Sequence, residues 1–344
     1  MGKEKGSSSD ELSTRPSNKP KYSRFTQQEL HACKPISTPM VVITSFISIG
    51  VLFVPIGLVT FSASQAVVEV VDRYDIDCIP LNYTSDKERV AFIQNGQIKK
   101  ACVRNIIVPK KMKQPIFIYY EIDDYYQNHR RYVESRSDKQ LRFPESESDT
   151  KSCSPESENN DGSIVPCGLA AWSLFNDTYA FSLKDKALPV NRKNIAWFSD
   201  RNKKYGSNVF PKNFQSGDLV GGGKLNESIP LNEQEDLLVW MRTATLPNFR
   251  KMYGMIEVDL EANEQITVEI ENNYNTYSFG GKKSIVIATT SWVGGKNNLL
   301  GVAYLTVGAV SFLFAFSFII MYMIRPRQYG DPDHLSRNKN TAEH

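Results

Sequence analysis

Residues 40–63, MVVITSFISIGVLFVPIGLVTFSA, carry no charge, and no charged residue occurs anywhere between Lys34 and Glu69. At about 1.5 Å per residue, a helix of this length crosses a hydrocarbon core about 30 Å thick. A second uncharged run, LLGVAYLTVGAVSFLFAFSFIIMYMI, covers residues 299–324. The sequence therefore predicts two transmembrane helices, which enclose one continuous segment, residues 64–298.

Each predicted span carries two glycines seven residues apart, Gly50 with Gly57 and Gly301 with Gly308. Residues at this spacing share one face of a helix, and small residues there let a second helix approach closely. We expect these four glycines to pack against a partner helix, although the spacing fits packing of the two spans on each other equally well. Pro55 lacks a backbone N–H and predicts a kink in the first span.

The charges that flank the spans predict which side of the membrane each segment occupies. Four basic residues precede the first span, namely Lys19, Lys21, Arg24 and Lys34, whereas Arg73 after it stands among three aspartates. Because basic residues favour the cytosolic side, we expect residues 1–39 and 325–344 to be cytosolic tails and residues 64–298 to be a lumenal or extracellular domain. Residues 1–20 are polar enough to be disordered. A cleaved signal peptide is disfavoured, because the apolar run is too long and the leader before it is too polar.

Four of the five cysteines fall in the segment between the spans, namely Cys78, Cys102, Cys153 and Cys167. Disulfides form in an oxidising compartment, and four cysteines allow three pairings. We favour Cys78 with Cys102 and Cys153 with Cys167, because each pair closes a short loop. The fifth cysteine, Cys33, lies on the predicted cytosolic side.

Three N-glycosylation sequons lie in the same segment, at Asn82, Asn176 and Asn226, and neither predicted tail contains one. A single sequon means little, but three on the predicted lumenal side are consistent with exposure to the secretory pathway. The sequence therefore predicts a glycoprotein.

Several runs of β-branched and aromatic residues between the spans predict strands. They cover residues 116–120, 256–260, 266–270 and 284–290, while the period of residues 67–74 is ambiguous. Gly and Asn clusters between the runs favour antiparallel pairing. The predicted class is a membrane protein whose two transmembrane helices flank a large, mainly antiparallel, sandwich-like β domain. Asn232 followed by Glu235 is a capping-box pattern that predicts a helix start, and residues 134–163 are expected to form an exposed loop.

No pattern in the chain predicts catalysis. His129, the only histidine between the spans, has no nucleophile pattern near it, which favours a structural role. No spacing of His, Cys or carboxylate residues predicts a metal site, and no Gly-rich loop has phosphate-binding spacing, so no cofactor is expected. The uncharged spans lack the ionisable groups of an ion path. A net charge of +3 is too small to indicate a nucleic-acid partner.

Five blocks of the sequence together resemble the cell division control protein 50 family, most closely its plant branch, the ALA-interacting subunits. They are PKYSRFTQQELHACKPI (20–36), YYQNHRRYVESRSDKQL (125–141), PCGLAAWSLFNDTY (166–179), EQEDLLVWMRTATLPNFRKMYG (233–254) and NNYNTYSFGGKKSIVIATTSWVGGKNN (272–298). The resemblance extends from Pro20 to about Pro332 and so covers nearly the whole chain. His31 and Thr245 depart from the family pattern, without affecting the topology or the cysteines.

The resemblance implies a non-catalytic β-subunit of a type IV P-type ATPase, a flippase that moves phospholipids from the exoplasmic or lumenal leaflet to the cytosolic leaflet. Such subunits bind the ATPase α-subunit as a hetero-dimer and support its exit from the endoplasmic reticulum, its stability and its activity. The chain itself lacks the DKTGT phosphorylation motif. The resemblance also implies disulfides at the two favoured pairs and a glycan at Asn176. It implies residence in membranes of the endoplasmic reticulum, the Golgi and endosomes or the plasma membrane.

Two other classes of function share some of these features. A free-standing two-span receptor or adhesion glycoprotein would have the same topology and glycans. A lumenal enzyme would need a pocket with convergent polar groups, for which the sequence gives no pattern. Residues 21–35 mix aromatic and basic side chains and fit either an interfacial anchor or a docking surface for a cytosolic partner.

Overall fold

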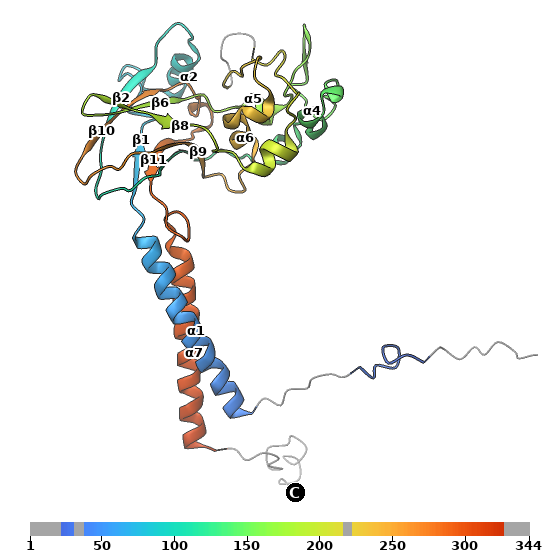
Figure 1. Cartoon of the computed structure of the whole chain (residues 1–344), viewed down its shortest axis with the longest axis vertical. Coiled ribbons are helices and arrows are strands. Elements are labelled where there is room, and N and C mark those ends of the chain that lie inside the picture. Colours follow the sequence, from blue (N-terminus) through green and yellow to red (C-terminus); the bar gives the residue numbers. More distant parts are fainter. Residues whose placement is uncertain (1–21, 31–37, 216–221, 327–344) are drawn as a thin grey trace, which may run out of the picture. The chain divides into compact units, whose positions relative to one another are not determined.

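The computed structural model describes residues 22–30, 38–215 and 222–326 (Figure 1). These residues divide into two compact units, one formed by the described residues up to Gly50 and from Val310 onward, and the other by the described residues between Val51 and Ala309. The second unit contains the β domain and the adjoining ends of both long helices. The predictions for residues 1–20, for Cys33 and for most of the C-terminal tail lie outside the described residues.

Two long apolar helices flank the β domain in the sequence. Helices α1 (Pro39–Gln65) and α7 (Asn298–Ile324) have 27 residues each, and neither contains a charged side chain. Only 17% of the most apolar stretch of each helix is buried by the rest of the protein, so most of its surface requires an apolar solvent such as lipid. The chain is therefore a membrane protein with two transmembrane helices, as predicted. Pro55 lies inside α1, which continues on both sides of it.

The β domain contains two antiparallel sheets (Figure 1). Sheet A has the order β1 (Glu69–Arg73), β11 (Lys283–Ala288), β3 (Ile116–Ile122), β9 (Phe249–Ile256) and β8 (Val190–Asn191). Sheet B has the order β2 (Ala101–Ile107), β10 (Gln265–Glu271), β6 (Thr178–Leu183) and β7 (Lys186–Leu188). A small hairpin pairs β4 (Glu158–Asn159) with β5 (Gly162–Ser163). The antiparallel β class is confirmed.

One hydrophobic core holds the two sheets together. In β3 every second residue is buried, from Ile116 to Ile122, and in β10 the residues Ile266, Val268 and Ile270 are fully buried. This period of two is that of a strand with one face against a core. Buried apolar residues of both sheets, among them Ile118 and Val268, belong to a single cluster, so the sandwich-like arrangement predicted from the sequence is present.

In the described part of the β domain, five short α-helices lie in the connections between strands. They are α2 (Asp86–Gln94), α3 (Arg130–Glu134), α4 (Asp138–Arg142), α5 (Leu169–Trp172) and α6 (Glu235–Met241). The predicted helix start at Asn232 is wrong, because residues Leu231–Glu233 form a 3-10 turn and α6 begins at Glu235. The Glu235 carboxylate accepts hydrogen bonds from the backbone N–H groups of Asn194 and Ala196. It is therefore not available for a capping box.

One predicted strand is displaced and one predicted loop is structured. The strand expected at residues 256–260 is displaced, because β9 ends at Ile256. The second buried residue of β9 is Lys251. A charged residue at this inward position breaks the alternation of apolar and polar residues that would identify the strand. Residues 134–163 were expected to be an exposed loop, but they include α4 and the β4–β5 hairpin. They also contribute Leu141 and Cys153 to the core, because the Cys153–Cys167 disulfide holds this segment inside the domain.

Candidate partner-binding surfaces and buried charged groups

The halves of α1 and α7 nearest the β domain contact each other at Gly57 and Gly301. A Cβ added to Gly301 would lie 2.8 Å from the Cα of Phe61, and one added to Gly57 would lie 2.9 Å from the backbone nitrogen of Leu305. A side chain at either position would overlap the backbone of the opposite helix. Glycine is therefore what allows α1 and α7 to approach this closely.

The remaining two glycines have the same relation to the opposite span. A Cβ on Gly308 would lie 2.6 Å from Cγ2 of Val54, and one on Gly50 would lie 2.7 Å from the ring of Phe312. All four glycines thus face the other span of the same chain. Of the two alternatives that the spacing leaves open, the structure has the packing of the two spans on each other. The span surface open to lipid or to another protein carries larger side chains. Among them are Leu52, Leu58, Val302 and Val307.

Polar contacts join the two spans at their domain-proximal ends. The Ser64 hydroxyl of α1 donates a 2.7 Å hydrogen bond to Oδ1 of Asn298 at the start of α7, and it accepts a 2.9 Å hydrogen bond from the backbone N–H of Asn297. Ser64 is buried. The two helices therefore enter the β domain at a defined separation.

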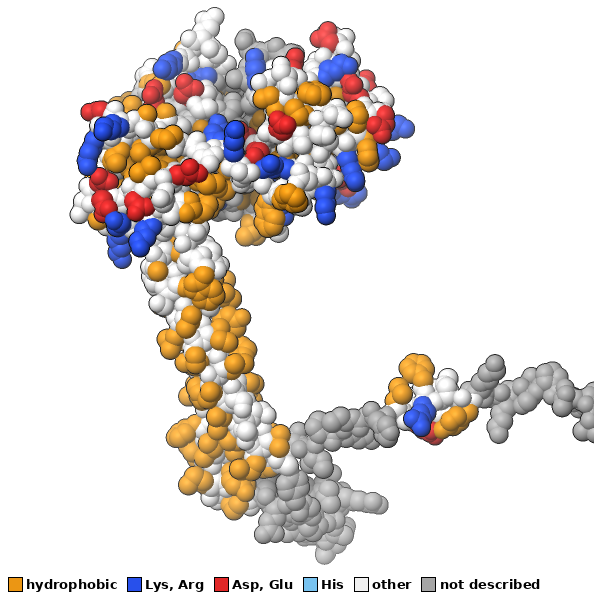
Figure 2. All heavy atoms as spheres, viewed as in Figure 1, with side chains coloured by type: hydrophobic (Ala, Val, Ile, Leu, Met, Phe, Trp, Pro, Cys, Tyr) orange, Lys and Arg blue, Asp and Glu red, His pale blue; other side chains and the backbone are white. Residues whose placement is uncertain are grey.

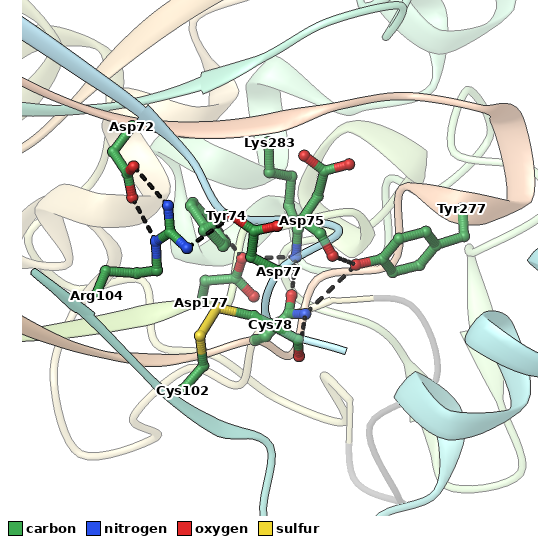
Figure 3. The surroundings of a disulfide bond; sticks show 11 residues. Asp72, Tyr74, Asp75, Asp77, Cys78, Cys102, Arg104, Asp177, Tyr277 and Lys283 are labelled. Atoms are coloured by element: carbon green, nitrogen blue, oxygen red, sulfur yellow. Dashed lines mark hydrogen bonds and ion pairs between the residues drawn. A yellow bond between two sulfur atoms is a disulfide. The ribbon is translucent and has the colours of Figure 1, made fainter. Parts of the chain in front are cut away.

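Lys283, at the start of β11, is a charged side chain with no solvent exposure (Figure 3). Its Nζ donates hydrogen bonds to Oδ2 of Asp177 at 2.7 Å and to the Tyr274 carbonyl at 2.5 Å, and a third to Asn272. Asp177 also accepts a 2.7 Å hydrogen bond from the hydroxyl of Tyr74. Burial lowers the pKa of Lys283, and the negative charge of Asp177 opposes that effect. The cluster links β11 to the start of β6 through the core.

The Cys78–Cys102 disulfide lies beside a second charged cluster (Figure 3). Arg104 of β2 places Nη2 2.8 Å from Oδ1 of Asp72 in β1, and its Nη1 lies 2.6 Å from Oδ2 of Asp77. β1 and β2 are edge strands of different sheets. The disulfide and the Arg104 ion pairs therefore fix one edge of sheet A against one edge of sheet B.

The second disulfide joins Cys153 to Cys167, so both observed pairs are the ones favoured from the sequence. Cys153 is completely buried. The buried Gln140 side chain accepts a 2.9 Å hydrogen bond from the Cys167 N–H and donates one of 2.9 Å to the Ile164 carbonyl. Two backbone groups that would otherwise lack partners are thereby satisfied.

Lys251 of β9 is a second buried cation, and its hydrogen-bond acceptors are backbone carbonyls. Its Nζ lies 2.6 Å from the carbonyl oxygens of Trp240 and Arg242 and 3.1 Å from that of Val239. The last carbonyls of a helix lack helical partners, so Lys251 closes the end of α6. Burial lowers the pKa of Lys251 to about 7, and the positive charge of Arg242 contributes to this.

A cavity of about 410 Å³ lies beside Lys251, and exposed aromatic residues border it. Trp197, one of the lining residues, is 64% exposed, and the neighbouring Phe198 is 74% exposed. The Arg242 guanidinium lies 4.2 Å from the Trp197 ring centroid. Aromatic residues and arginine are enriched in protein interfaces, which makes this area a candidate contact surface for a protein partner.

The three sequons differ in accessibility. Asn82 and Asn226 are exposed, whereas Asn176 is half-buried. The middle residue of the Asn176 sequon is Asp177, which holds Lys283, so this sequon is part of the charged cluster in the core. Asn176 lines a cavity of about 280 Å³, and its side-chain oxygen has no hydrogen-bond partner in the described part of the chain.

The described residues contain no group of three or more His, Cys, Asp or Glu side chains that could hold a metal ion. His129 precedes α3 and makes no side-chain capping hydrogen bond. His129 is exposed, and within the described residues its side chain makes no hydrogen bond to a Ser, Thr or Cys side chain. The buried lysines Lys283 and Lys251 bind backbone carbonyls and core side chains. These contacts hold the fold together.

Sequence reasoning missed the buried charges Lys283, Asp177 and Lys251. Charged residues are almost never fully buried unless they are paired, so residue type alone does not predict burial at these positions. A weak signal was available for Lys251, because it occupies an inward position in the alternation of β9. No local signal identifies Lys283, since its partner Asp177 is 106 residues away.

Comparison with known proteins gives a consistent result along the chain. The LEM3 (ligand-effect modulator 3) family / CDC50 family is matched over residues 60–328. "ALA-interacting subunit 3" of Arabidopsis thaliana is 56% identical over 335 residues, which cover 97% of this chain and 95% of the relative. "Cell cycle control protein 50A" of Mus musculus is 34% identical, covering 88% of this chain and 89% of the relative. "Phospholipid-transporting ATPase accessory subunit CRF1" of Saccharomyces cerevisiae is 31% identical, covering 97% and 93%.

Proposed function

The chain belongs to the LEM3/CDC50 family, and we propose that it is the non-catalytic β-subunit of a type IV P-type ATPase phospholipid flippase. The observation that carries the proposal is the family match over residues 60–328, which include the β domain and all of α7. A relative of similar length is named an accessory subunit of a phospholipid-transporting ATPase. The α-subunit performs ATP hydrolysis and phospholipid transfer from the exoplasmic or lumenal leaflet to the cytosolic leaflet.

The proposed complex is a hetero-dimer in which this chain contacts the α-subunit on three levels. The β domain covers the lumenal loops of the α-subunit, the outward faces of α1 and α7 lie beside its membrane helices, and residues 21–35 contact its cytosolic side. The four span glycines are excluded from this interface, because the chain's own spans occupy them. Both termini are cytosolic, and residues 64–298 face the lumen or the cell exterior.

The physical role of the β-subunit is differential binding. A P-type ATPase alternates between conformations, and a subunit that binds some of them more tightly than others shifts their populations by the difference in binding free energy. Binding also stabilises the folded α-subunit by mass action. Stabilisation by binding accounts for the stability of the α-subunit and its exit from the endoplasmic reticulum. The shift between conformations accounts for the support of its activity.

Two disulfides and N-linked glycans suit the proposed lumenal position of the β domain. Disulfides persist in the oxidising secretory pathway. We assign a glycan to Asn176 and further glycans to the exposed residues Asn82 and Asn226. The complex is expected in endoplasmic reticulum, Golgi and endosomal membranes and at the plasma membrane.

Co-purification tests this proposal directly. The full chain, tagged at its C-terminus, is purified from membranes in mild detergent, and mass spectrometry identifies and quantifies the proteins retained. The expected result is one type IV P-type ATPase in near-equal amount, with ATP hydrolysis in the complex and none in the isolated chain. A tagged, unrelated two-span glycoprotein serves as the control. Recovery of the chain alone would favour a free-standing receptor or adhesion glycoprotein, and ATP hydrolysis by the isolated chain would contradict the proposal.

A further inference from the structure

A cavity of about 340 Å³, lined by both charged and apolar side chains, lies where the β domain meets the start of α7. Its lining includes Glu69 of β1, Tyr119 of β3 and Arg250 of β9, together with Lys296 before α7 and Leu300 in the first turn of α7. The volume lies at the lower end of the roughly 300–1,000 Å³ typical of small-ligand sites. We call it the membrane-proximal pocket.

The position of the pocket is set by the connection from β11 to α7 (Figure 1). β11 ends at Ala288 and α7 begins at Asn298, so the residues between them lie at the end of the membrane span. Trp292 in this connection is 75% exposed, as is typical of a residue at a membrane–water interface. Leu299 and Leu300, in the first turn of α7, are 75% and 41% exposed. One wall of the pocket therefore continues into the lipid-facing surface of α7.

The charges at the pocket balance to zero. Arg250 donates a 2.8 Å hydrogen bond to Glu69 and a second hydrogen bond to Glu121. Lys296 is exposed and makes no hydrogen bond or ion pair within the described residues. Glu121 is not part of the pocket lining but binds Arg250, so two carboxylates offset two cations at and beside the pocket, and Lys296 is available to bind an anionic group.

A group that carries both charges fits this arrangement better than a net anion. Lys296 can bind a phosphate, while Glu69 and the outward-facing ring of Tyr119 can bind a quaternary or primary ammonium group. Aromatic rings and carboxylates are the groups that recognise such cations. A net anion would find no surplus positive charge, because the two carboxylates already balance Arg250 and Lys296.

We propose that the membrane-proximal pocket binds the headgroup of a zwitterionic phospholipid, such as phosphatidylcholine or phosphatidylethanolamine, from the leaflet that the β domain faces. The phosphate contacts Lys296, the ammonium group contacts Glu69 and Tyr119, and an acyl chain follows Leu300 along α7. The chain then touches a phospholipid itself, which goes beyond its proposed role as an accessory subunit. The site requires only the two spans and the β domain of this chain.

Mass spectrometry of the intact, detergent-purified full chain tests the site. Equimolar phosphatidylcholine, phosphatidylethanolamine and phosphatidylserine are added, and the lipids retained per chain are counted. We expect the two zwitterionic lipids to be retained at least threefold more than phosphatidylserine. Lys296→Glu and Tyr119→Leu should each lower that retention at least threefold. Lys282→Glu, which makes the same charge change at the opposite end of β11, should leave it unchanged.

Several outcomes overturn the proposal. Equal retention by wild type and the pocket variants, with unchanged thermal unfolding midpoints, would show that lipid binds elsewhere. Preference for phosphatidylserine would contradict the zwitterionic assignment. Displacement of bound lipid by millimolar glycerophosphocholine would point to a soluble phosphodiester as the ligand. Loss of the α-subunit from Lys296→Glu preparations, with lipid retention unchanged, would mean that a protein covers the pocket. Recovery of the ATPase is measured separately, so failure of this site leaves the accessory role intact.

Discussion

Lys283 and Asp177 form an ion pair, 2.7 Å between Nζ and Oδ2, in which neither side chain is exposed to solvent. The pair connects β11, the second strand of sheet A, to the residue directly before β6 of sheet B. Replacing only one of the two residues would leave the other as an uncompensated charge in the core, which costs far more stability than the loss of a surface ion pair.

Lys283→Met is therefore expected to lower the free energy of unfolding by about 3–5 kcal/mol. The thermal unfolding midpoint of the protein in mild detergent measures this loss. Adding Asp177→Asn removes the stranded carboxylate, preserves the sequon, and should recover part of the stability. Lys282→Met, at the exposed neighbouring position, should change stability by about 0.5 kcal/mol or less. A double variant no more stable than Lys283→Met would contradict the ion-pair argument.

Alanine at the span glycines should have graded effects. Gly301→Ala places a Cβ 2.8 Å from the Phe61 backbone, which has no freedom to move aside, whereas Gly50→Ala meets the ring of Phe312, which can rotate. We expect Gly301→Ala to destabilise the span pair by about 1–3 kcal/mol and Gly50→Ala by less. Thermal unfolding in detergent compares them, with Gly295→Ala as control, since its Cβ meets nothing within 4 Å. Equal midpoints for Gly301→Ala and Gly50→Ala would disprove the packing argument.

Both disulfides should be required for a stable β domain. Replacing Cys78 and Cys102 by Ser should cost about 2–5 kcal/mol, and replacing Cys153 and Cys167 should cost a similar amount. Unreduced peptide mapping should recover the two linked pairs and should show alkylation only at Cys33. Recovery of a peptide that links Cys78 to Cys153 would refute the observed connectivity.

The stability of the β domain should rise with pH above neutrality because of Lys251. The folded-state pKa of Lys251 is about 7, below the value of about 10.4 for an unfolded chain. Between these values the unfolded state binds more protons, so the free energy of unfolding rises with pH, by at most about 1.4 kcal/mol per unit. Below pH 7 both states are charged, and this contribution is constant. Lys251→Met should abolish the rise between pH 7 and 10, and equal slopes for both proteins would exclude the effect.

Glycans on the folded protein should differ in their sensitivity to amidase. Asn82 and Asn226 are exposed, whereas Asn176 is half-buried in a cavity. Native treatment with an N-glycan amidase should release glycans at the two exposed sites several times faster than at Asn176, and unfolding should remove the difference. Site-resolved peptide mass spectrometry measures the three rates. Equal rates on the native protein, or the absence of a glycan at Asn176, would contradict the assignment.

On the face shown in Figure 2, charged and hydrophobic side chains are mixed across the β domain, whereas the spans show hydrophobic and uncharged groups without Lys, Arg, Asp or Glu. Local composition is enough to predict this contrast. The same reasoning located β3, β10 and β11 within a few residues, because their β-branched and aromatic runs are bounded by polar turns.

Local patterns failed where a distant residue decided the outcome. Asn232 and Glu235 have the spacing of a capping box, but the Glu235 carboxylate is bound by the backbone of residues 194 and 196. The strand expected at residues 256–260 lies at Phe249–Ile256 instead. Its pattern was obscured by Lys251, whose burial depends on the end of α6.

The sequence by itself determined the two membrane spans, the antiparallel β class and the set of cysteines between the spans, because hydrophobicity, β propensity and residue identity are local properties. Only the tertiary structure decided that the spans fill each other's glycine faces and that Lys283, Asp177 and Lys251 are buried. These features depend on contacts between residues far apart in the chain, as for Ser64 and Asn298, which are 234 positions apart. The free energy of such contacts comes from excluding water and satisfying polar groups at the same time, and folding alone brings those groups together.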